Sequence, residues 1–316
     1  MTPPPIQGFI SRLALLALLA VAIIGGSAWA QLRRSDPNVL HLTSGGRERS
    51  VLLRQPVGAG RGPWPLVILL HGGSGTGKRM SQLADFDEAA DRHGYLLAFP
   101  DGVDEQWADG RGLAASEKAG VDDVRFIADL IARLVADRKA DPRRIYVAGI
   151  SNGGMMSQRV ACELADRVAA FGSVAANLPT ALARTCRPRM PVGAAYVLGT
   201  ADPFMPFAGG EIEAGTGGTV LSAAESVAFW VRHNDCVSPP QAQKLERRQR
   251  RDDTRVEIDR WKRCRPGGAV LDVTVEGGGH TWPGGRQYLP AAVIGPTSRQ
   301  LDATDLLFEF FSRFTR

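Results

Sequence analysis

The chain has 316 residues, of which 38 are lysine or arginine and 33 are aspartate or glutamate, giving a formal net charge of +5 at pH 7. A basic excess this small is not the charge balance of a nucleic-acid-binding protein, so no nucleic-acid partner is expected. The length suits a single open sheet covered by helices.

The first thirty residues have the composition of an export signal. A single charge, Arg12, precedes an apolar run over residues 13–24, a glycine-containing break and a cleavage-type triplet that ends at Ala30. This pattern predicts a signal peptide over residues 1–30, cleaved near Ala30, and a secreted or periplasmic protein. An uncleaved membrane anchor is the alternative, but the apolar run is shorter than the roughly 20 residues that span a bilayer. No stable membrane anchor is therefore expected.

Strand-like and helix-like segments alternate along the rest of the chain. The clearest helix covers residues 122–138, with acidic residues in its first turn and an apolar stripe along one face. A capping box beginning at Ser222 predicts another helix, and a further one closes the chain over residues 304–314. The alternation predicts an α/β fold, a mostly parallel open sheet flanked by helices, as one domain over residues 31–316. Apolar runs predict strands at residues 51–54, 66–70, 96–99, 145–148, 194–198, 255–258 and 270–275.

A glycine-rich turn, His71-Gly72-Gly73, follows the strand predicted at residues 66–70. Such a turn can offer a backbone N–H to a developing oxyanion, which makes Gly73 a candidate oxyanion-hole residue. The same segment comes within one residue of the phosphate-binding pattern G-x-x-x-x-G-K-[ST]. Arg79 stands where that pattern has the hydroxyl residue that binds magnesium. An NTPase is thus the alternative from another class, and the export signal also argues against it.

A serine between two glycines, G-I-S-N-G at residues 149–153, stands between a predicted strand and a helical pattern. This arrangement is typical of a nucleophile elbow, a turn so sharp that its flanking positions need residues without a Cβ. Ser151 is the candidate nucleophile, and the backbone N–H of Asn152 is the second candidate oxyanion donor. A chance occurrence of the pattern is the alternative, against which the strand and helix on either side count.

The acid and the base are expected farther along the chain, because α/β-hydrolases place the acid after the serine and the histidine last. Asp202 follows the strand predicted at residues 194–198, and His280 lies in a glycine-rich segment beyond the last predicted strand. In this mechanism Ser151 attacks an ester carbonyl, His280 takes its proton, and Asp202 orients the imidazole. An exposed loop histidine is the alternative for His280. Three acids in strongly polar stretches compete with Asp202 in chain order: Asp235, Asp252 and Asp253.

All four cysteines, Cys162, Cys186, Cys236 and Cys264, follow the predicted signal peptide. An even number in an oxidising compartment suggests two disulfides. Three connectivities are possible, and the sequence-local pairs Cys162 with Cys186 and Cys236 with Cys264 are favoured. The spacing matches no zinc-binding pattern, and neither a metal nor another cofactor is expected.

Two segments leave alternatives open. Residues 207–219 are glycine-rich and follow Asp202, so they form either a flexible rim over the substrate or a long surface loop. Residues 244–265 interleave arginine with acidic residues. That pattern predicts a solvated hairpin, with contact to an anionic surface as the alternative.

With these features the chain resembles the secreted α/β-hydrolases of the poly(3-hydroxybutyrate) depolymerase and feruloyl esterase type. The resemblance covers nearly all of the chain beyond the signal peptide and implies ester hydrolysis by Ser151, Asp202 and His280. Relatives commonly carry Asn at the position of Ala108, so any contact of that amide is missing here. The motifs that carry the resemblance are residues 71–73, 99–102, 107, 109–112, 149–156, 199–203 and 278–285.

Two tryptophans within these motifs, Trp107 and Trp282, are candidates for the lining of an acyl pocket, with core packing as the alternative. The predicted function is a secreted serine esterase acting on poly(3-hydroxybutyrate)-type hydroxyalkanoate oligomers. A feruloyl or acetyl esterase acting on plant polysaccharide esters is the alternative, followed by an acyltransferase and a non-catalytic binding protein. Because no appended binding module is recognised, soluble oligomers or small esters are expected as substrates in preference to solid polymer.

Overall fold

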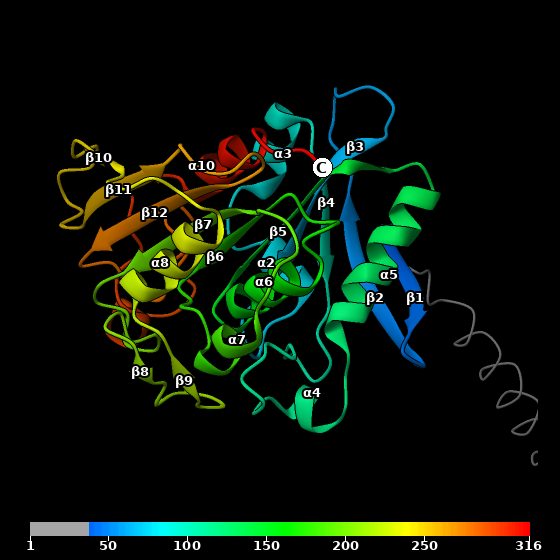
Figure 1. Cartoon of the computed structure of the whole chain (residues 1–316), viewed down its shortest axis with the longest axis horizontal. Coiled ribbons are helices and arrows are strands. Elements are labelled where there is room, and N and C mark those ends of the chain that lie inside the picture. Colours follow the sequence, from blue (N-terminus) through cyan, green and yellow to red (C-terminus); the bar gives the residue numbers. More distant parts are fainter. Residues whose placement is uncertain (1–37) are drawn as a thin grey trace, which may run out of the picture. The chain divides into compact units, whose positions relative to one another are not determined.

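A mostly parallel β-sheet forms the centre of the fold (Figure 1). The computed structural model describes residues 38–316, so the predicted signal peptide lies outside the described residues. The central sheet consists of the strands β1 (Val39–Ser44), β2 (Arg47–Arg54), β3 (Trp64–Leu70), β4 (Leu96–Pro100), β5 (Ala140–Ile150), β6 (Ala170–Val174), β7 (Gly193–Gly199), β10 (Gln241–Lys244), β11 (Arg255–Trp261) and β12 (Ala269–Glu276). Their order across the sheet is β1-β2-β4-β3-β5-β6-β7-β12-β11-β10. Neighbours from β4 through β12 run parallel, whereas β2 pairs antiparallel with β4, β11 with β12, and β10 with β11.

Helices cover both faces of this sheet (Figure 1). The helices are α2 (Gly77–Ser81), α3 (Phe86–His93), α4 (Ala115–Lys118), α5 (Asp123–Ala136), α6 (Asn152–Glu163), α7 (Thr180–Thr185), α8 (Ala223–His233), α9 (Ala291–Ile294) and α10 (Ala303–Phe311). Leu66, Ile68 and Leu70 of β3 pack in one core with residues of α5, α6 and α8. Val67 and Leu69 pack in a second core with α3 and α10. Strand β3 is buried on both faces, which explains its unbroken apolar sequence.

All seven strands predicted from the sequence are present, as β2, β3, β4, β5, β7, β11 and β12. The prediction missed β6, whose sequence A-F-G-S-V has little β-propensity although every one of its residues is buried. A Cβ on Gly172 would lie 3.0 Å from the Leu307 side chain of α10. Close packing against α10 therefore keeps position 172 small, and this glycine interrupts the apolar run that would have signalled the strand.

The predicted helices are also present. The helix expected over residues 122–138 is α5, and the last helix is α10. Ser222 and Glu225 form the expected capping box at the start of α8, each side chain accepting from the other residue's backbone N–H. Among residues 38–316, no helix has the length and apolarity needed to cross a membrane.

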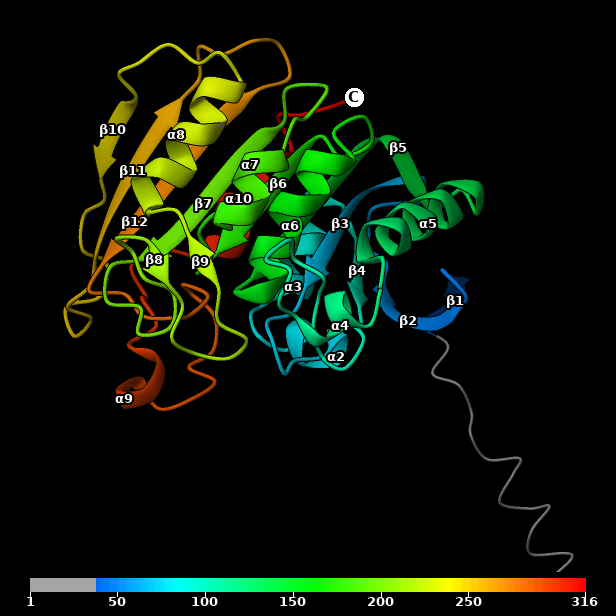
Figure 2. The same ribbon diagram turned by 60° about the horizontal axis from the view of Figure 1, so that its bottom comes forward.

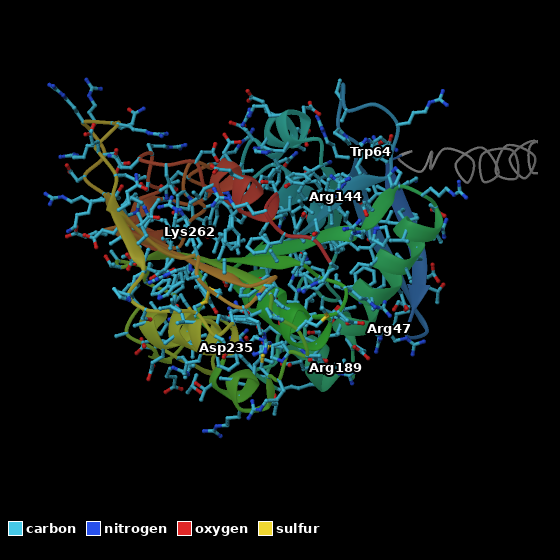
Figure 3. The ribbon with its side chains drawn as sticks, turned by 45° about the horizontal axis from the view of Figure 1, so that its top comes forward. Arg47, Trp64, Arg144, Arg189, Asp235 and Lys262 are labelled. Carbon is cyan, nitrogen blue, oxygen red and sulfur yellow. A yellow bond between two sulfur atoms is a disulfide. The ribbon has the colours of Figure 1, made fainter. Side chains whose placement is uncertain are left out.

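The two segments left open by the sequence form β-hairpins. Residues 207–219 contain β8 (Gly210–Glu211) and the first residue of β9 (Thr219–Val220), and these two short strands pair antiparallel. Residues 244–265 begin at the last residue of β10 and contain β11, which pairs antiparallel with β10, and most of the loop between the two strands is exposed. Figure 3 shows nitrogen-tipped side chains of this loop projecting away from the sheet. Its geometry is that of a solvated hairpin.

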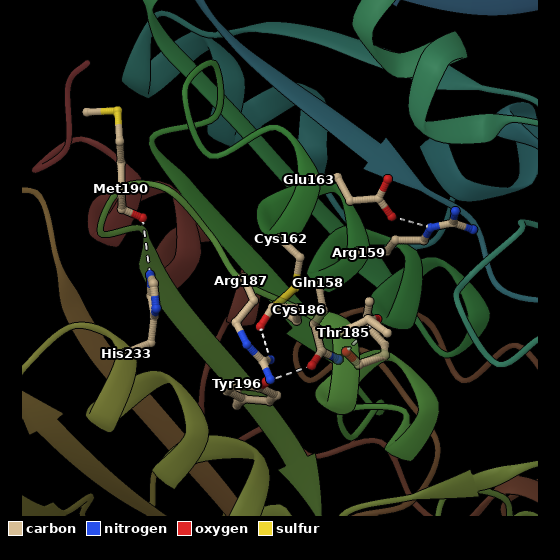
Figure 4. The surroundings of a disulfide bond; sticks show 11 residues. Gln158, Arg159, Cys162, Glu163, Thr185, Cys186, Arg187, Met190, Tyr196 and His233 are labelled. Atoms are coloured by element: carbon tan, nitrogen blue, oxygen red, sulfur yellow. Dashed lines mark hydrogen bonds and ion pairs between the residues drawn. A yellow bond between two sulfur atoms is a disulfide. The ribbon is translucent and has the colours of Figure 1, made fainter.

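Two disulfides lie on the face of the sheet that α5, α6 and α8 cover. Cys162 near the end of α6 is bonded to Cys186, which directly follows α7 (Figure 4). Cys236, just beyond α8, is bonded to Cys264, just beyond β11. The two cysteines of each bond are 24 and 28 residues apart in the sequence. The first bond links the end of α6 to the end of α7, and the second links the end of α8 to the end of β11.

Several loops gather along one edge of the sheet. Figure 2 shows α2, α4, α9 and the β8–β9 hairpin along this edge. The parallel strands β3, β5, β7 and β12 end there, so their following residues meet even though they are distant in sequence. In open parallel sheets this carboxyl edge is where ligands bind.

Candidate active site

Ser151 occupies a sharp turn between β5 and α6. Its backbone has φ 56° and ψ −123°, a conformation that costs free energy for any residue with a side chain. A Cβ on Gly149 would lie 2.3 Å from the Gly153 carbonyl oxygen, and one on Gly153 would lie 2.3 Å from that of Leu70. Both glycines are therefore required for the turn, which holds Ser151 at the end of the sheet.

The glycine turn after β3 lies directly against this elbow. A Cβ on Gly72 would be 3.5 Å from Ser151 Cβ, and one on Gly73 would be 4.0 Å from Asn152 Cβ. Asn152 is the first residue of α6, so its backbone N–H has no acceptor within the helix. The two predicted oxyanion donors, Gly73 and Asn152, thus stand next to each other beside the serine.

Trp107 links the turn at residues 71–73 to the nucleophile elbow through two hydrogen bonds. Its indole Nε1 donates to the His71 carbonyl at 2.9 Å, and its backbone N–H donates to Asn152 Oδ1 at 2.8 Å. Trp107 is fully buried and does not line the cavity beside Ser151. The sequence expectation that it contacts an acyl group is therefore wrong, because its ring is enclosed in the core and its polar atoms position the backbone.

His71 is a structural residue in this turn. Its Nε2 accepts from the Gly102 N–H at 2.9 Å, so the proton of the neutral ring is on Nδ1, which lies 2.8 Å from the Gly72 carbonyl oxygen. Burial lowers the pKa of His71. The ring is therefore neutral near pH 7 and stabilises the turn through two backbone contacts.

Asp202 and His280 come from the adjacent parallel strands β7 and β12. His280 Nδ1 and Asp202 Oδ2 lie 2.8 Å apart, and the two side chains are 6% and 2% exposed. The other carboxylate oxygen of Asp202 accepts from the backbone N–H groups of Phe204 and Met205, each at 2.8 Å. The carboxylate is thus fixed by three contacts and holds the imidazole in one orientation.

The loop that carries His280 is held just as firmly. The backbone N–H of His280 donates to the Ile294 carbonyl at 2.6 Å, and the Tyr288 hydroxyl donates to the His280 carbonyl at 2.8 Å. A Cβ on Gly279 would lie 2.2 Å from the Ile294 oxygen, so this position also requires glycine. Burial raises the pKa of the Tyr288 hydroxyl, which stays protonated and able to donate.

A cavity of about 820 Å³ opens over these residues. Ser151, Asn152, Gly73 and His280 all line it, while Asp202 stands behind His280. Sequence reasoning missed its apolar wall, whose residues come from helices and loops that are far apart in the sequence: Met80, Leu83, Met155, Phe204, Met205, Ile212 and Leu289. Residues 212 and 214–216 of the β8–β9 hairpin belong to the lining, so this segment forms a rim of the cavity.

Trp282 does not take part in that wall. It is fully buried, packs edge-on against Phe86 with ring centroids 5.2 Å apart, and donates from Nε1 to Thr304 Oγ1 at 3.0 Å. The expectation that Trp282 lines the acyl pocket is therefore also wrong. Its position two residues beyond His280 directs the ring into the core between α3 and α10.

A buried carboxylate that the sequence left without a role, Asp109, supports the elbow from behind. Asp109 Oδ2 accepts from Asn152 Nδ2 at 2.6 Å and from Arg111 Nη2 at 2.8 Å. The Arg111 guanidinium also donates to the Gly217 carbonyl in the hairpin rim. Burial raises the pKa of Asp109, and the contacts with Arg111 and Asn152 oppose that shift. This network connects the elbow to the rim, and only the three-dimensional contacts reveal it.

The fold and the site's position define an α/β-hydrolase. The acetyl xylan esterase from Aspergillus awamori superimposes with a TM-score of 0.57 over 87% of this chain and 98% of its own, at 13% identity. The family model described as "Esterase PHB depolymerase" matches residues 49–180. NocK of Nocardia uniformis subsp. tsuyamanensis, a proposed esterase, is 33% identical over 280 residues, covering 84% of this chain and 79% of NocK.

The chain therefore belongs to the PHB depolymerase family of esterases. A feruloyl esterase B of Piromyces equi is 28% identical over 237 residues, which are 73% of this chain and 42% of that protein. The proteins that this chain resembles thus have names that point to different esters.

Proposed function

We propose that this protein is a secreted serine esterase in which Ser151, His280 and Asp202 form the catalytic triad. The observation that carries the proposal is the 2.8 Å contact between His280 and Asp202 beside the cavity that Ser151 also lines. A histidine held by a buried carboxylate and a serine on a strained elbow, both lining one cavity, are the groups needed to activate a hydroxyl nucleophile.

The proposed reaction proceeds through an acyl-enzyme. Ser151 Oγ attacks the ester carbonyl carbon while His280 Nε2 accepts the hydroxyl proton, and Asp202 stabilises the imidazolium that forms. The N–H groups of Gly73 and Asn152 stabilise the oxyanion, where one such donor typically contributes about 10² to 10³ in rate. His280 then gives the proton to the departing alcohol. Water, deprotonated by His280, next attacks the acyl group and releases the acid from Ser151.

The proposed substrates are soluble hydroxyalkanoate oligomers of the poly(3-hydroxybutyrate) type. The family description and the largely apolar wall around Ser151 support this choice, since short alkyl side chains suit such a wall. Feruloyl or acetyl esters of plant polysaccharides are the second candidate. The name of the Piromyces relative and the fold shared with an acetyl xylan esterase favour them.

Export is part of the proposal. A signal peptide over residues 1–30 and a catalytic domain over residues 31–316 would place the enzyme outside the cytoplasm. Two disulfides among the described residues support an oxidising compartment, because such bonds are rare in the cytosol. Mass spectrometry of the exported protein, with a new N-terminus near residue 31, tests this point.

The experiment that tests the catalytic proposal compares initial hydrolysis rates of three purified proteins: the unmodified enzyme, Ser151→Ala, and the control Ser312→Ala, which alters an exposed serine at the end of α10. Each is assayed on 3-hydroxybutyrate oligomers and on methyl ferulate. We expect turnover of the oligomers that Ser151→Ala abolishes and Ser312→Ala leaves unchanged. Ser151-dependent turnover of methyl ferulate alone would favour the second candidate. Turnover that persists in Ser151→Ala would contradict the proposed nucleophile.

A further inference from the structure

The cavity beside Ser151 has an uneven charge. Among the described residues that line it, three are arginine and none is aspartate or glutamate: Arg79, Arg111 and Arg286. An uncharged ester needs no cation in its binding cavity. The positive charge of this wall therefore indicates that the substrate has an anionic group in addition to its ester bond.

Arg111 does not present a free charge to the cavity. Its guanidinium contacts the buried Asp109 carboxylate through Nε at 3.0 Å and Nη2 at 2.8 Å, and it also donates to the Gly217 carbonyl. Its side chain is only 6% exposed. The pair is neutral as a unit, and its role is the support of the rim and of Asn152.

Arg79 and Arg286 differ from Arg111 in this respect. Both are exposed, and neither forms an ion pair with any carboxylate in residues 38–316. Arg79 donates from Nη1 to the Ser74 carbonyl at 3.0 Å, which leaves its remaining N–H groups available. The Arg286 side chain makes no hydrogen bond to a described residue. These two charges are uncompensated within the wall.

The backbone brings the two arginines to neighbouring segments of the wall. Arg79 lies in α2, and the Gln82 N–H that follows this helix donates to the Arg79 carbonyl at 3.2 Å. Leu83, the next residue, accepts from the Arg286 N–H at 2.7 Å. The loop that carries His280 is thus joined to the end of α2, and the two side chains enter one cavity from hydrogen-bonded segments.

We propose that Arg79 and Arg286 bind a carboxylate group of the substrate, so that the enzyme selects esters that carry a free acid. The inference rests on the esterase function proposed above and names its substrate class more narrowly. A guanidinium presents a fork of donors that matches a carboxylate. A linear hydroxyalkanoate oligomer has such a carboxylate at one end, whereas acetyl and feruloyl esters of polysaccharides have none beside the ester.

The size of the effect follows from the exposure of both groups. Two unit charges 4 Å apart attract by about 1 kcal/mol at the dielectric constant of water, which corresponds to about a fivefold effect on kcat/KM for each arginine. Loss of both arginines is expected to lower kcat/KM for an acid-terminated ester by about 25-fold when the effects add. The same loss leaves a neutral ester almost unaffected. Added salt weakens the preference, because exposed charges are screened.

The test uses 3-hydroxybutyrate dimers, trimers and tetramers with either a free carboxylate or a terminal carboxamide. The carboxamide keeps the shape of the acid and removes its charge. The proteins are the unmodified enzyme, the double variant Arg79→Gln/Arg286→Gln and the control Arg189→Gln, which removes an exposed arginine outside the cavity lining. 4-Nitrophenyl acetate, a neutral ester, reports Ser151-dependent activity in each protein.

For the unmodified enzyme and for Arg189→Gln, we expect a higher kcat/KM for the acid than for the amide at one or more chain lengths. We expect the double variant to lose this preference and to keep its rate on 4-nitrophenyl acetate. Equal rates for acid and amide at all three lengths, or a preference that survives in the double variant, would overturn the carboxylate site and leave the esterase proposal standing. Absence of Ser151-dependent turnover of every ester would overturn both.

Discussion

Asp272 predicts an unusual dependence of stability on pH. This residue lies on β12, where it faces Asp259 of β11 and Tyr196 of β7 across the sheet. Its Oδ1 is buried and has no hydrogen-bond partner among the described residues. Burial, with a smaller contribution from the Asp259 charge, raises the pKa of Asp272 from 3.8 to about 7.

The sign of the effect follows from proton binding. Between about pH 4 and pH 7 the folded protein keeps a proton on Asp272 that the unfolded chain releases, so the free energy of unfolding falls as pH rises through this window. Each unit of pKa shift corresponds to about 1.4 kcal/mol, and the shift to about 7 therefore predicts a loss of about 4 kcal/mol. Above pH 7 the full penalty remains.

Replacement of Asp272 by asparagine removes this titration and keeps the shape of the side chain. We expect Asp272→Asn to gain stability over the unmodified protein as pH rises, with the difference growing by about 4 kcal/mol between pH 4 and pH 8. Urea unfolding followed by tryptophan fluorescence at several pH values measures it. The control Asp253→Asn changes a carboxylate that is 100% exposed and should add no such slope. A difference between Asp272→Asn and the unmodified protein that stays constant with pH would refute the reasoning.

Three further substitutions test the site. Asp109→Ala leaves Arg111 as a buried charge without its carboxylate and should cost about 3–5 kcal/mol of unfolding free energy, measured by urea unfolding. The control Asp305→Ala removes a carboxylate from an exposed ion pair and should cost under about 1 kcal/mol. Equal losses in the two variants would contradict this prediction. Gly153→Ala places a Cβ 2.3 Å from the Leu70 carbonyl oxygen, which should cost about 3 kcal/mol of unfolding free energy and most of the esterase rate. A variant with full stability and full activity would contradict the close packing of this turn. Asp202→Asn should lower kcat by about 10⁴ with little change in KM, and steady-state rates showing less than a tenfold loss would count against its place in the triad.

The sequence predicted the fold well because most strands carry a strong apolar signal. Strand β3 is apolar on both faces and is bounded by turn residues. Helix α5 has apolar residues at helical spacing along one face and an acidic residue in its first turn. Strand β6 was missed because Gly172 and Ser173 interrupt its apolar run, and the packing of α10 that keeps Gly172 small leaves no local pattern. The edge strand β10 was missed for the opposite reason, since all four of its residues are exposed.

The candidate site divides in the same way. The positions of Ser151 and His280 beyond the strand ends could be predicted because the crowded backbone beside each requires glycines, and glycines are visible in a sequence. The two tryptophans were misjudged because position beside a motif does not determine which way a ring points, and both rings point into the core. Asp109 received no role because its importance depends on contacts with Asn152 and with the hairpin rim.

The register of the strands accounts for how residues distant in sequence meet at this site. Strands β3 and β5 pair with Leu70 opposite Gly149, which places the Gly73 turn beside Ser151. Strands β7 and β12 pair with Gly199 opposite Val275, which brings the loops of Asp202 and His280 together. The register of the sheet therefore brings the two loops of each pair together. Residues beyond the strand ends supply the rest of the cavity wall, including Arg79 of α2 and Arg286 of the loop that carries His280.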